Sequence, residues 1–216
     1  MTAGEVAARV EAIFAAAGAY REGHFGLKSG RHGDRYIEKF QVLQWPAHVA
    51  ELCSLLIDGV AGASSGAPAS GRRFDVVVGP TTGGVILAYE CARQLGARGI
   101  FAEQVAGPDG RPTRALRRGF RVEPGERVLL VDDVVSTGAS LQEMLPVVEA
   151  DAGELAIAVV VDRSGGLRER VSVQTGRRYP VVALWTLDLP TWAAGDDCPG
   201  CGAGLPLEKP GSSGVG

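Results

Sequence analysis

Residues 74–186 of this 216-residue chain contain short apolar runs that alternate with segments of helical spacing. Each run is apolar at nearly every position, which is typical of strands buried on both faces of a parallel sheet. We predict strands at residues 74–78, 99–105, 127–131, 155–161 and 181–186, with helices at residues 84–95 and 139–150. The chain is therefore expected to adopt an α/β fold with a central parallel sheet flanked by helices. Ligands of such sheets bind beyond the carboxyl ends of the strands.

Fewer helices and strands are predicted outside residues 74–186 than within them. Helices are expected at residues 1–20 and 46–60, because apolar residues recur there at helical spacing. Residues 36–40 predict a short strand between these helices. Residues 196–216 are rich in glycine and proline, and we expect an irregular tail there. The expected organisation is one domain over residues 1–195 followed by this tail.

Charge and composition exclude several classes of partner. The chain has 22 lysines and arginines against 25 aspartates and glutamates, so no basic surface for nucleic acid is expected. No apolar run approaches the roughly 20 residues that cross a bilayer, which argues against a membrane partner. Four cysteines in a chain of this length are too few for a disulfide scaffold, and we expect a cytoplasmic protein.

Residues 127–140 carry the strongest functional signal. An apolar strand delivers Asp132 and Asp133 to its carboxyl end, and a turn of small, hydroxylated and glycine residues then leads into a helix. Carboxylates accept hydrogen bonds from sugar hydroxyls, while free N–H groups at a helix N-terminus bind phosphate. The pattern predicts a site for a phosphorylated sugar, with solvated cap residues as the alternative. Nucleotide-binding folds are disfavoured, because neither G-x-x-x-x-G-K-[ST] nor G-x-G-x-x-G occurs.

Residues 128–140 resemble the phosphoribosyl diphosphate (PRPP) motif of type I phosphoribosyltransferases. The resemblance implies the fold of that family, with Asp132 and Asp133 holding the ribose hydroxyls and acting in catalysis. It implies Mg²⁺ as a cofactor, held mainly by substrate oxygens and water. The following loop would wrap the 5′-phosphate of PRPP through Val134, Val135, Ser136, Thr137, Gly138, Ala139 and Ser140.

Residues 24–31 resemble the N-terminal signature of the orotate branch of this family. The resemblance implies that Lys28 reaches the substrates as a catalytic residue and that Tyr36 lies against the orotate ring. It also implies a small N-terminal hood over about residues 20–45, above a core of about residues 46–190. A solvated lysine in a glycine-rich turn and a tyrosine of the hood core are the alternatives.

A glycine-rich turn follows the strand expected at residues 74–78. The backbone N–H groups of Thr81, Thr82 and Gly83 would present donors to an anion there. The resemblance implies a contact with pyrophosphate at this turn, and a tight turn without a ligand is the alternative. Many orotate enzymes carry an aromatic residue and a lysine in place of Thr82 and Gly83, so we expect the contact to come from the backbone.

Residues 106–120 form a loop rich in glycine and arginine. In the family a mobile basic loop closes over the pyrophosphate, often across the interface of a homodimer. This chain has arginines in place of the family's lysines and histidine, and arginine binds phosphate through two donors. We expect Arg117 and Arg118 to contact PRPP and the chain to form a homodimer. Arg111 and Arg114 fit a solvated loop equally well.

Arg163 follows the strand expected at residues 155–161. In orotate phosphoribosyltransferases an arginine after this strand meets the orotate, and a forked guanidinium suits a carboxylate. The resemblance implies Ser136 as the other orotate contact. A surface ion pair of Arg163 with Asp162 or Glu169 is the alternative.

Cys198 and Cys201 have the spacing of a zinc knuckle. A structural zinc site needs four ligands, and the sequence offers no evident second pair, since Cys53 and Cys91 lie on apolar helix faces. Two chains of a dimer would complete such a site. A structural Zn²⁺, free thiols and a local disulfide therefore remain as alternatives.

The resemblance implies that the chain transfers the phosphoribosyl group of PRPP to orotate. Three other hypotheses remain open on the sequence. They are a phosphoribosyltransferase for another base, a non-catalytic PRPP-binding regulator, and a zinc-knuckle interaction protein.

Overall fold

The computed structural model describes residues 1–27, 29–63, 73–107 and 110–210. Within these ranges the main sheet has seven strands in the order β5-β4-β3-β6-β7-β9-β8. The strands from β4 to β9 in this order run parallel, and β5 and β8 add antiparallel edges, so the predicted central parallel sheet is confirmed. Their bounds are β3 (Val76–Pro80), β4 (Arg98–Ala106), β5 (Pro112–Leu116), β6 (Arg127–Val135), β7 (Glu154–Asp162), β8 (Glu169–Val171) and β9 (Arg178–Thr186).

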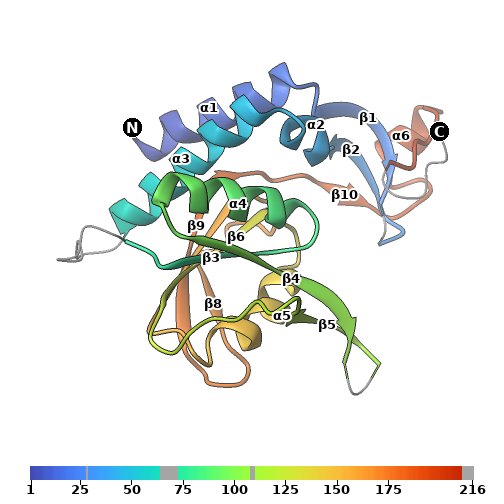
Figure 1. The fold of residues 1–216 in the computed structure, drawn as a ribbon. Helices are drawn as coiled ribbons and strands as arrows, with labels where there is room; N and C mark the ends of the chain where they lie inside the picture. The colour runs from blue at the N-terminus through green and yellow to red at the C-terminus, as the bar shows by residue number, and fades with distance from the viewer. Residues whose placement is uncertain (28, 64–72, 108–109, 211–216) are drawn as a thin grey trace.

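Helices cover both faces of this sheet (Figure 1). The helices α1 (Ala3–Ala16), α3 (Pro46–Ala63) and α4 (Gly83–Leu95) lie on one face, and α5 (Ala139–Val148) lies on the other. In β6, Leu129 faces the first helical layer while its neighbours Val128 and Leu130 face α5. This alternation explains why residues 128–131 of the strand are all apolar, because both faces of the strand are buried.

The described residues contain a second, antiparallel sheet, which we call the hood. It consists of β1 (Tyr20–Gly26), β2 (His32–Ile37) and β10 (Thr191–Trp192), and α2 (Lys39–Leu43) follows β2. The C-terminal segment also joins the hood, because the N–H of Glu208 donates to the carbonyl of His24 and the carbonyl of Glu208 accepts from Gly26. Figure 1 shows β1, β2, β10 and the short helix α6 (Pro199–Gly202) together at one side of the molecule.

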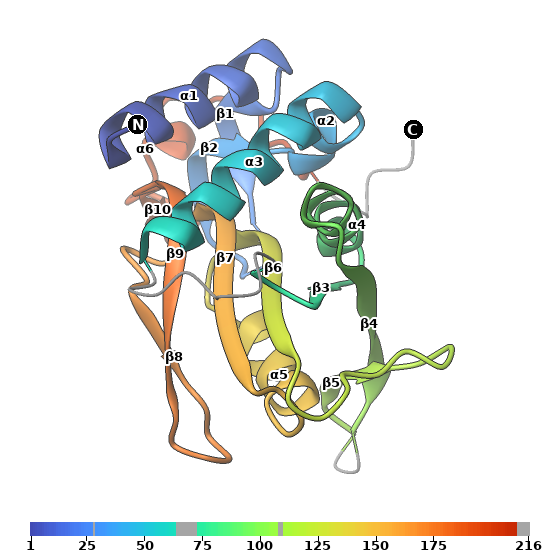
Figure 2. The same ribbon diagram turned by 60° about the vertical axis from the view of Figure 1, so that its left-hand side comes forward.

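Three local predictions are wrong. The strand expected at residues 36–40 ends at Ile37, because Glu38 caps the Phe40 N–H and helix α2 begins at Lys39. Residues 106–120 are not wholly a loop, since β5 pairs with β4 to form a hairpin that projects from the sheet edge (Figure 2). The tail expected to be irregular contains α6 and hydrogen-bonds to β1.

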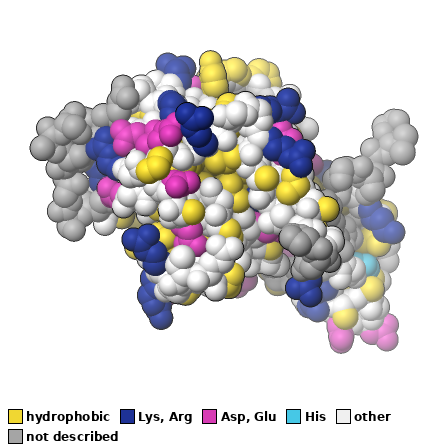
Figure 3. All heavy atoms as spheres, turned by 60° about the horizontal axis from the view of Figure 1, so that its bottom comes forward, with side chains coloured by type: hydrophobic (Ala, Val, Ile, Leu, Met, Phe, Trp, Pro, Cys, Tyr) yellow, Lys and Arg dark blue, Asp and Glu magenta, His cyan; other side chains and the backbone are white. Residues whose placement is uncertain are grey.

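Surface charge follows the balance seen in the sequence. Figure 3 shows one face of the molecule, on which lysine and arginine side chains lie in separate groups with acidic side chains among them. None of the helices in the described residues is long and apolar enough to cross a bilayer.

Candidate functional site

A cleft of about 220 Å³ lies at the carboxyl ends of β3 and β6. The turn before α4, the loop before α5, the start of α2 and one residue of β5 also reach it. This is the position at which parallel α/β sheets bind ligands. The residues that line the cleft are Lys39, Pro80, Thr81, Thr82, Gly83, Arg114, Asp132, Asp133, Val134, Ser136, Thr137, Gly138, Ala139 and Ser140.

Asp132 and Asp133 lie inside β6, which continues beyond them to Val135, and each is only 4% exposed. Asp132 accepts hydrogen bonds from the Ser140 hydroxyl at 2.6 Å and from the N–H of Asp133 at 2.9 Å. Burial, together with the charge of Asp133, raises the pKa of Asp132 to about 6. The cleft therefore contains a carboxyl group that changes its charge just below neutral pH.

Lys39 balances the second carboxylate. Its Nζ lies 2.9 Å from Oδ1 and 2.7 Å from Oδ2 of Asp133, so the hood places a positive charge directly on the floor of the cleft. Lys39 is not among the site residues predicted from the sequence. Its rarity was the one sequence feature that could have drawn attention to Lys39, because Lys28, Lys39 and Lys209 are the only lysines of the chain.

The turn between β3 and α4 packs against the same carboxylate. A Cβ atom at Gly83 would lie 1.6 Å from Oδ2 of Asp133, so only glycine fits at this position. At Gly79, a Cβ atom would lie 2.1 Å from the carbonyl oxygen of Gly84, which explains the glycines at both ends of the turn. Thr81, Thr82 and Gly83 thus all line the cleft beside Asp133.

Arg114 is the arginine that the β4–β5 hairpin brings to the cleft. Its Nη1 donates to the carbonyl and the hydroxyl of Thr81, both at 3.1 Å, and its Nε pairs with Glu143 at 3.2 Å. Arg117 and Arg118, which were predicted to contact PRPP, do not line the cleft of their own chain. Both are exposed beyond the end of β5, and Arg118 pairs with Glu103.

The loop before α5 has the geometry of an anion cradle. Gly138 adopts a φ of 75° and is the N-cap residue of α5, so the first N–H groups of the helix face the cleft. Arg170 of β8, which the sequence did not single out, donates from Nη2 to the Thr137 carbonyl at 2.7 Å. A Cβ atom at Gly138 would lie 1.1 Å from that nitrogen, so a residue with a side chain there would displace Arg170. The Ser140 hydroxyl, expected at the phosphate, donates to Asp132.

Arg163 lies beside this loop, because its N–H donates to the carbonyl of Val135, the residue before Ser136. Its Nε is buried without a hydrogen-bond partner among the described residues, and burial lowers the pKa of its guanidinium. Burial raises the pKa of Tyr36, and the charge of Arg163 opposes that rise, so the two side chains are near each other. Lys28 lies outside the described residues.

The alternative of an ion pair for Arg163 is wrong. Asp162 is fully buried and accepts hydrogen bonds from the N–H groups of Ser164 and Leu167, while Glu169 pairs with Arg178. Arg163 is therefore oriented by its backbone bond to β6 and not by either carboxylate.

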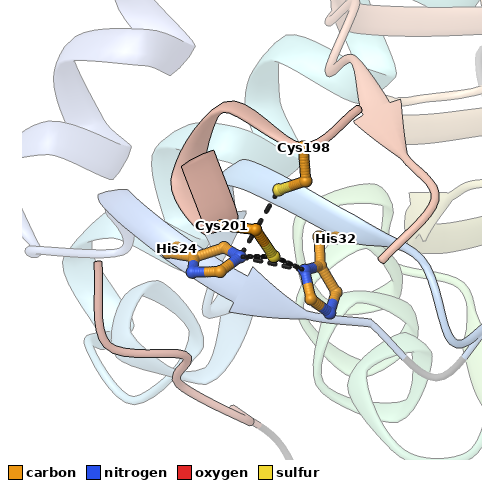
Figure 4. A group of neighbouring side chains, drawn as sticks. All are labelled: His24, His32, Cys198 and Cys201. Carbon is orange, nitrogen blue, oxygen red and sulfur yellow. Dashed lines mark hydrogen bonds between the residues drawn. The ribbon is translucent and has the colours of Figure 1, made fainter. Parts of the chain in front are cut away.

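A second cluster lies in the hood, away from the cleft. Cys198 and Cys201 of the tail meet His24 and His32 of the hood strands, and the four ligand atoms lie within 4.8 Å of one another (Figure 4). The expectation that the chain offers no second pair of ligands is therefore wrong. His24 belongs to the signature segment that was identified, but no local pattern linked it to the cysteines 174 residues away.

Comparisons with known proteins agree with this geometry. Residues 48–177 match the family model described as "Phosphoribosyl transferase domain". The chain is 44% identical to the orotate phosphoribosyltransferase of Pelotomaculum thermopropionicum over 204 residues, which are 94% of this chain and 96% of that protein. It is 40% identical to the orotate phosphoribosyltransferase of Acidithiobacillus ferrooxidans over 216 residues, covering all of both chains.

Solved structures show the same fold. The orotate phosphoribosyltransferase from Aeropyrum pernix superposes with a TM-score of 0.60 at 24% identity, covering 82% of this chain and 93% of that chain. The adenine phosphoribosyltransferase from Rhodothermus marinus superposes with a TM-score of 0.59 at 22% identity, covering 84% and 99%. Since enzymes named for different bases share this fold equally well, the fold does not select the base.

We predict that Asp132→Asn stabilises the protein at about pH 8. A carboxyl whose folded pKa is raised to about 6 opposes folding when it ionises. This cost is absent below the unfolded pKa near 4 and complete above about pH 6, where it reaches about 1–3 kcal/mol. Asparagine keeps an acceptor for the Asp133 N–H. Thermal unfolding should show a higher Tm for the variant, with a gain that shrinks as the pH falls. A gain that is equal at pH 4 and 8 would contradict the assignment.

Proposed function

Since this chain belongs to the orotate phosphoribosyltransferases of the phosphoribosyl transferase family, we propose that it converts orotate and PRPP to orotidine 5′-monophosphate and pyrophosphate. This reaction is a step of pyrimidine nucleotide biosynthesis. The observation that carries the proposal is the cleft in which two buried carboxylates, a glycine turn and a helix N-terminus converge. The four cysteines are free thiols, which suits a cytoplasmic enzyme.

The carboxylates are suited to the sugar. Asp132 and Asp133 would accept hydrogen bonds from the ribose 2′- and 3′-hydroxyls at the floor of the cleft. The loop of Ser136 to Ser140 would hold the 5′-phosphate through its N–H groups, and Arg170 adds a positive charge behind Thr137. Held at both ends, the ribose has its anomeric carbon fixed for the reaction.

The leaving pyrophosphate needs positive charge and backbone donors. The turn of Thr81, Thr82 and Gly83 offers N–H groups at the cleft, and Arg114 and Lys39 offer the cations. The oxygen donors of Asp132 and Asp133 also suit Mg²⁺, which would be held mostly by substrate oxygens and water. When bound, Mg²⁺ supplies charge neutralisation on the diphosphate. Lys39 is already next to the carboxylates, so part of the charge balance is built into the hood.

Catalysis in this scheme rests on position and electrostatics. The anomeric carbon becomes electron-poor as pyrophosphate leaves, and the orotate nitrogen attacks from the opposite face. The negative charges of Asp132 and Asp133 lie close to the developing positive charge on the ribose ring. The hood would cover the base and exclude water from this step. Lys28, which the sequence predicts to reach the substrates, lies outside the described residues.

Arg163 would select the base. A half-buried guanidinium with an unpaired Nε is costly unless a ligand supplies an acceptor, and the orotate carboxylate is such an acceptor. Ser136 lines the cleft next to it, and Tyr36 lies near its charge. Because the fold is shared with an adenine enzyme, a preference for orotate depends on these side chains. A phosphoribosyltransferase for another base is the alternative function.

A turnover assay tests the function directly. The protein is incubated with Mg²⁺ and PRPP together with orotate, uracil, adenine or guanine, and pyrophosphate release is measured. We expect release with orotate and little with the other bases. Release with a purine alone would establish the alternative, and release with none would favour a PRPP-binding regulator.

We predict that Asp133→Asn lowers kcat/KM by at least about 100-fold while the fold is retained. Asparagine keeps an acceptor for the N–H of Val134 but removes the charge that faces Lys39 and the ribose. Steady-state kinetics and circular dichroism provide the measurement. Asp151→Asn, at an exposed position, is the matched control. Near-normal turnover in Asp133→Asn would contradict the role.

We predict that Arg163→Gln raises KM for orotate by about 10- to 100-fold, the loss of one charge-assisted hydrogen bond in a half-buried site. KM for PRPP should change little, because Arg163 is assigned to the base alone. Arg168→Gln removes a nearby exposed arginine and serves as the control. An equal rise in both KM values would instead indicate damage to the loop at Ser136.

We also infer a homodimer in which Arg111 of the β4–β5 hairpin reaches the neighbouring cleft, while Arg114 of the same hairpin lines its own. The projection of this hairpin from the sheet edge supports the inference (Figure 2). On this inference Asp133→Asn and Arg111→Ala should each be inactive alone. Mixing and reassembling them should restore about a quarter of the sites, because half of the dimers are mixed and each mixed dimer has one intact cleft. A hairpin that serves its own chain would give no recovery.

A further inference from the structure

Two segments far apart in the chain bring four metal-binding side chains together in the hood. His24 lies in β1 and His32 begins β2, while Cys198 precedes and Cys201 lies within the short helix α6 (Figure 4). His24, His32 and Cys198 are buried, and Cys201 is partly buried. The convergence is independent of the cleft, since none of these residues lines it.

The distances among the donor atoms are those of a small tetrahedron. His24 Nε2 and His32 Nδ1 are 2.9 Å apart, and the Cys201 Sγ lies 3.3 Å from His32 Nδ1. His24 Nε2 lies 3.4 Å from the Cys198 Sγ and 3.7 Å from the Cys201 Sγ. Bonds of about 2.0 Å to nitrogen and 2.3 Å to sulfur give tetrahedral edges of roughly 3.3–3.8 Å. An ion therefore fits after shifts of a few tenths of an ångström.

The tautomer of His24 is set by a backbone contact. Its Nδ1 lies 2.9 Å from the carbonyl oxygen of Leu205, which only accepts hydrogen bonds. Nδ1 must therefore carry the proton, and the lone pair of Nε2 points at the two sulfur atoms. A hydrogen bond from the non-ligating nitrogen to a carbonyl is the usual support of a metal-bound histidine.

The turn between the cysteines is shaped to admit the histidine ring. A Cβ atom at Gly200 would lie 2.5 Å from the Cγ of His24, so a side chain there would push the ring out of the cluster. The N–H of Gly202 donates to the Cys198 carbonyl at 3.0 Å, which closes the turn and directs both sulfur atoms to the same side.

We propose that His24, His32, Cys198 and Cys201 of one chain bind a structural Zn²⁺ ion that fastens the C-terminal segment to the hood. Two cysteines and two histidines form a closed set of ligands for this ion. Two thiolates balance the charge of the ion, so the buried site is neutral overall. The ion would reinforce the contacts that Glu208 already makes with β1.

The proposal is tested by measuring how much Zn²⁺ the chain binds and how binding changes its thermal stability. Neither measurement depends on enzyme turnover. The full chain is stripped with a chelator, dialysed and titrated with Zn²⁺ against a chromogenic chelator. We expect one tightly bound Zn²⁺ per chain and a rise in Tm of at least about 5 °C on binding. Co²⁺ in its place should give the intense visible absorption of a tetrahedral site with thiolate ligands.

Variants of single cysteines and histidines show whether Zn²⁺ binds at this cluster or elsewhere in the chain. Cys201→Ser and His32→Gln should each weaken Zn²⁺ binding by at least about 100-fold. Cys91→Ala and His48→Gln, which lie outside the cluster, should retain the ion. If either cluster variant fails to fold, the Zn²⁺ titration and the Co²⁺ spectrum of the unmodified chain still decide the question.

Four results would overturn the proposal. The first is a reduced, folded chain that does not bind Zn²⁺ in the titration. The second is a Cys198–Cys201 disulfide found by mass spectrometry in the protein isolated without oxidant. The third is unchanged zinc binding in both cluster variants. A dimer that shares one ion between two chains would show half an ion per chain and would also contradict it.

Discussion

Asp132 and Asp133 end a run of buried apolar residues, so two adjacent negative charges must be accommodated where little water reaches them. The surrounding structure supplies a positive charge, a hydrogen-bond donor and space for these carboxylates. Lys39 pairs with Asp133 from the hood, and the Ser140 hydroxyl donates to Asp132 from the loop before α5. Gly83 leaves room for the carboxylate from the third side. Hood, turn and loop therefore meet at this pair of side chains, and their meeting forms the cleft.

The sequence predicted the parts of the fold that depend on local patterns. The central sheet was predictable because β6 and its neighbours are apolar on both faces, and the acidic pair was predictable because it directly follows the apolar residues 128–131. Helix α2 was missed, because residues 36–40 fit a short strand and the cap provided by Glu38 is visible only in three dimensions. The β4–β5 hairpin was missed because its arginines and glycines resemble a loop.

Residues that act through tertiary contacts were harder to predict. Arg114 and Arg118 look alike in sequence, but the strand β5 turns the first toward Thr81 and leaves the second exposed with Glu103. Arg170 lies on an edge strand, with no sequence signal connecting it to Thr137. The two cysteines of the tail were recognisable by their spacing. Their partners His24 and His32 were not, because the hood sheet alone brings the histidines together.

The contacts of the hood with the last part of the chain set an order for folding during synthesis. The strands β1 and β2 are made early, but β2 pairs with β10, and β1 hydrogen-bonds to Glu208. All strands of the main sheet are complete at Thr186, before either partner of the hood has left the ribosome. The core can therefore assemble first, and the hood sheet is completed last. A nascent chain with a formed core would therefore have an incomplete hood sheet until β10 and the segment around Glu208 emerge.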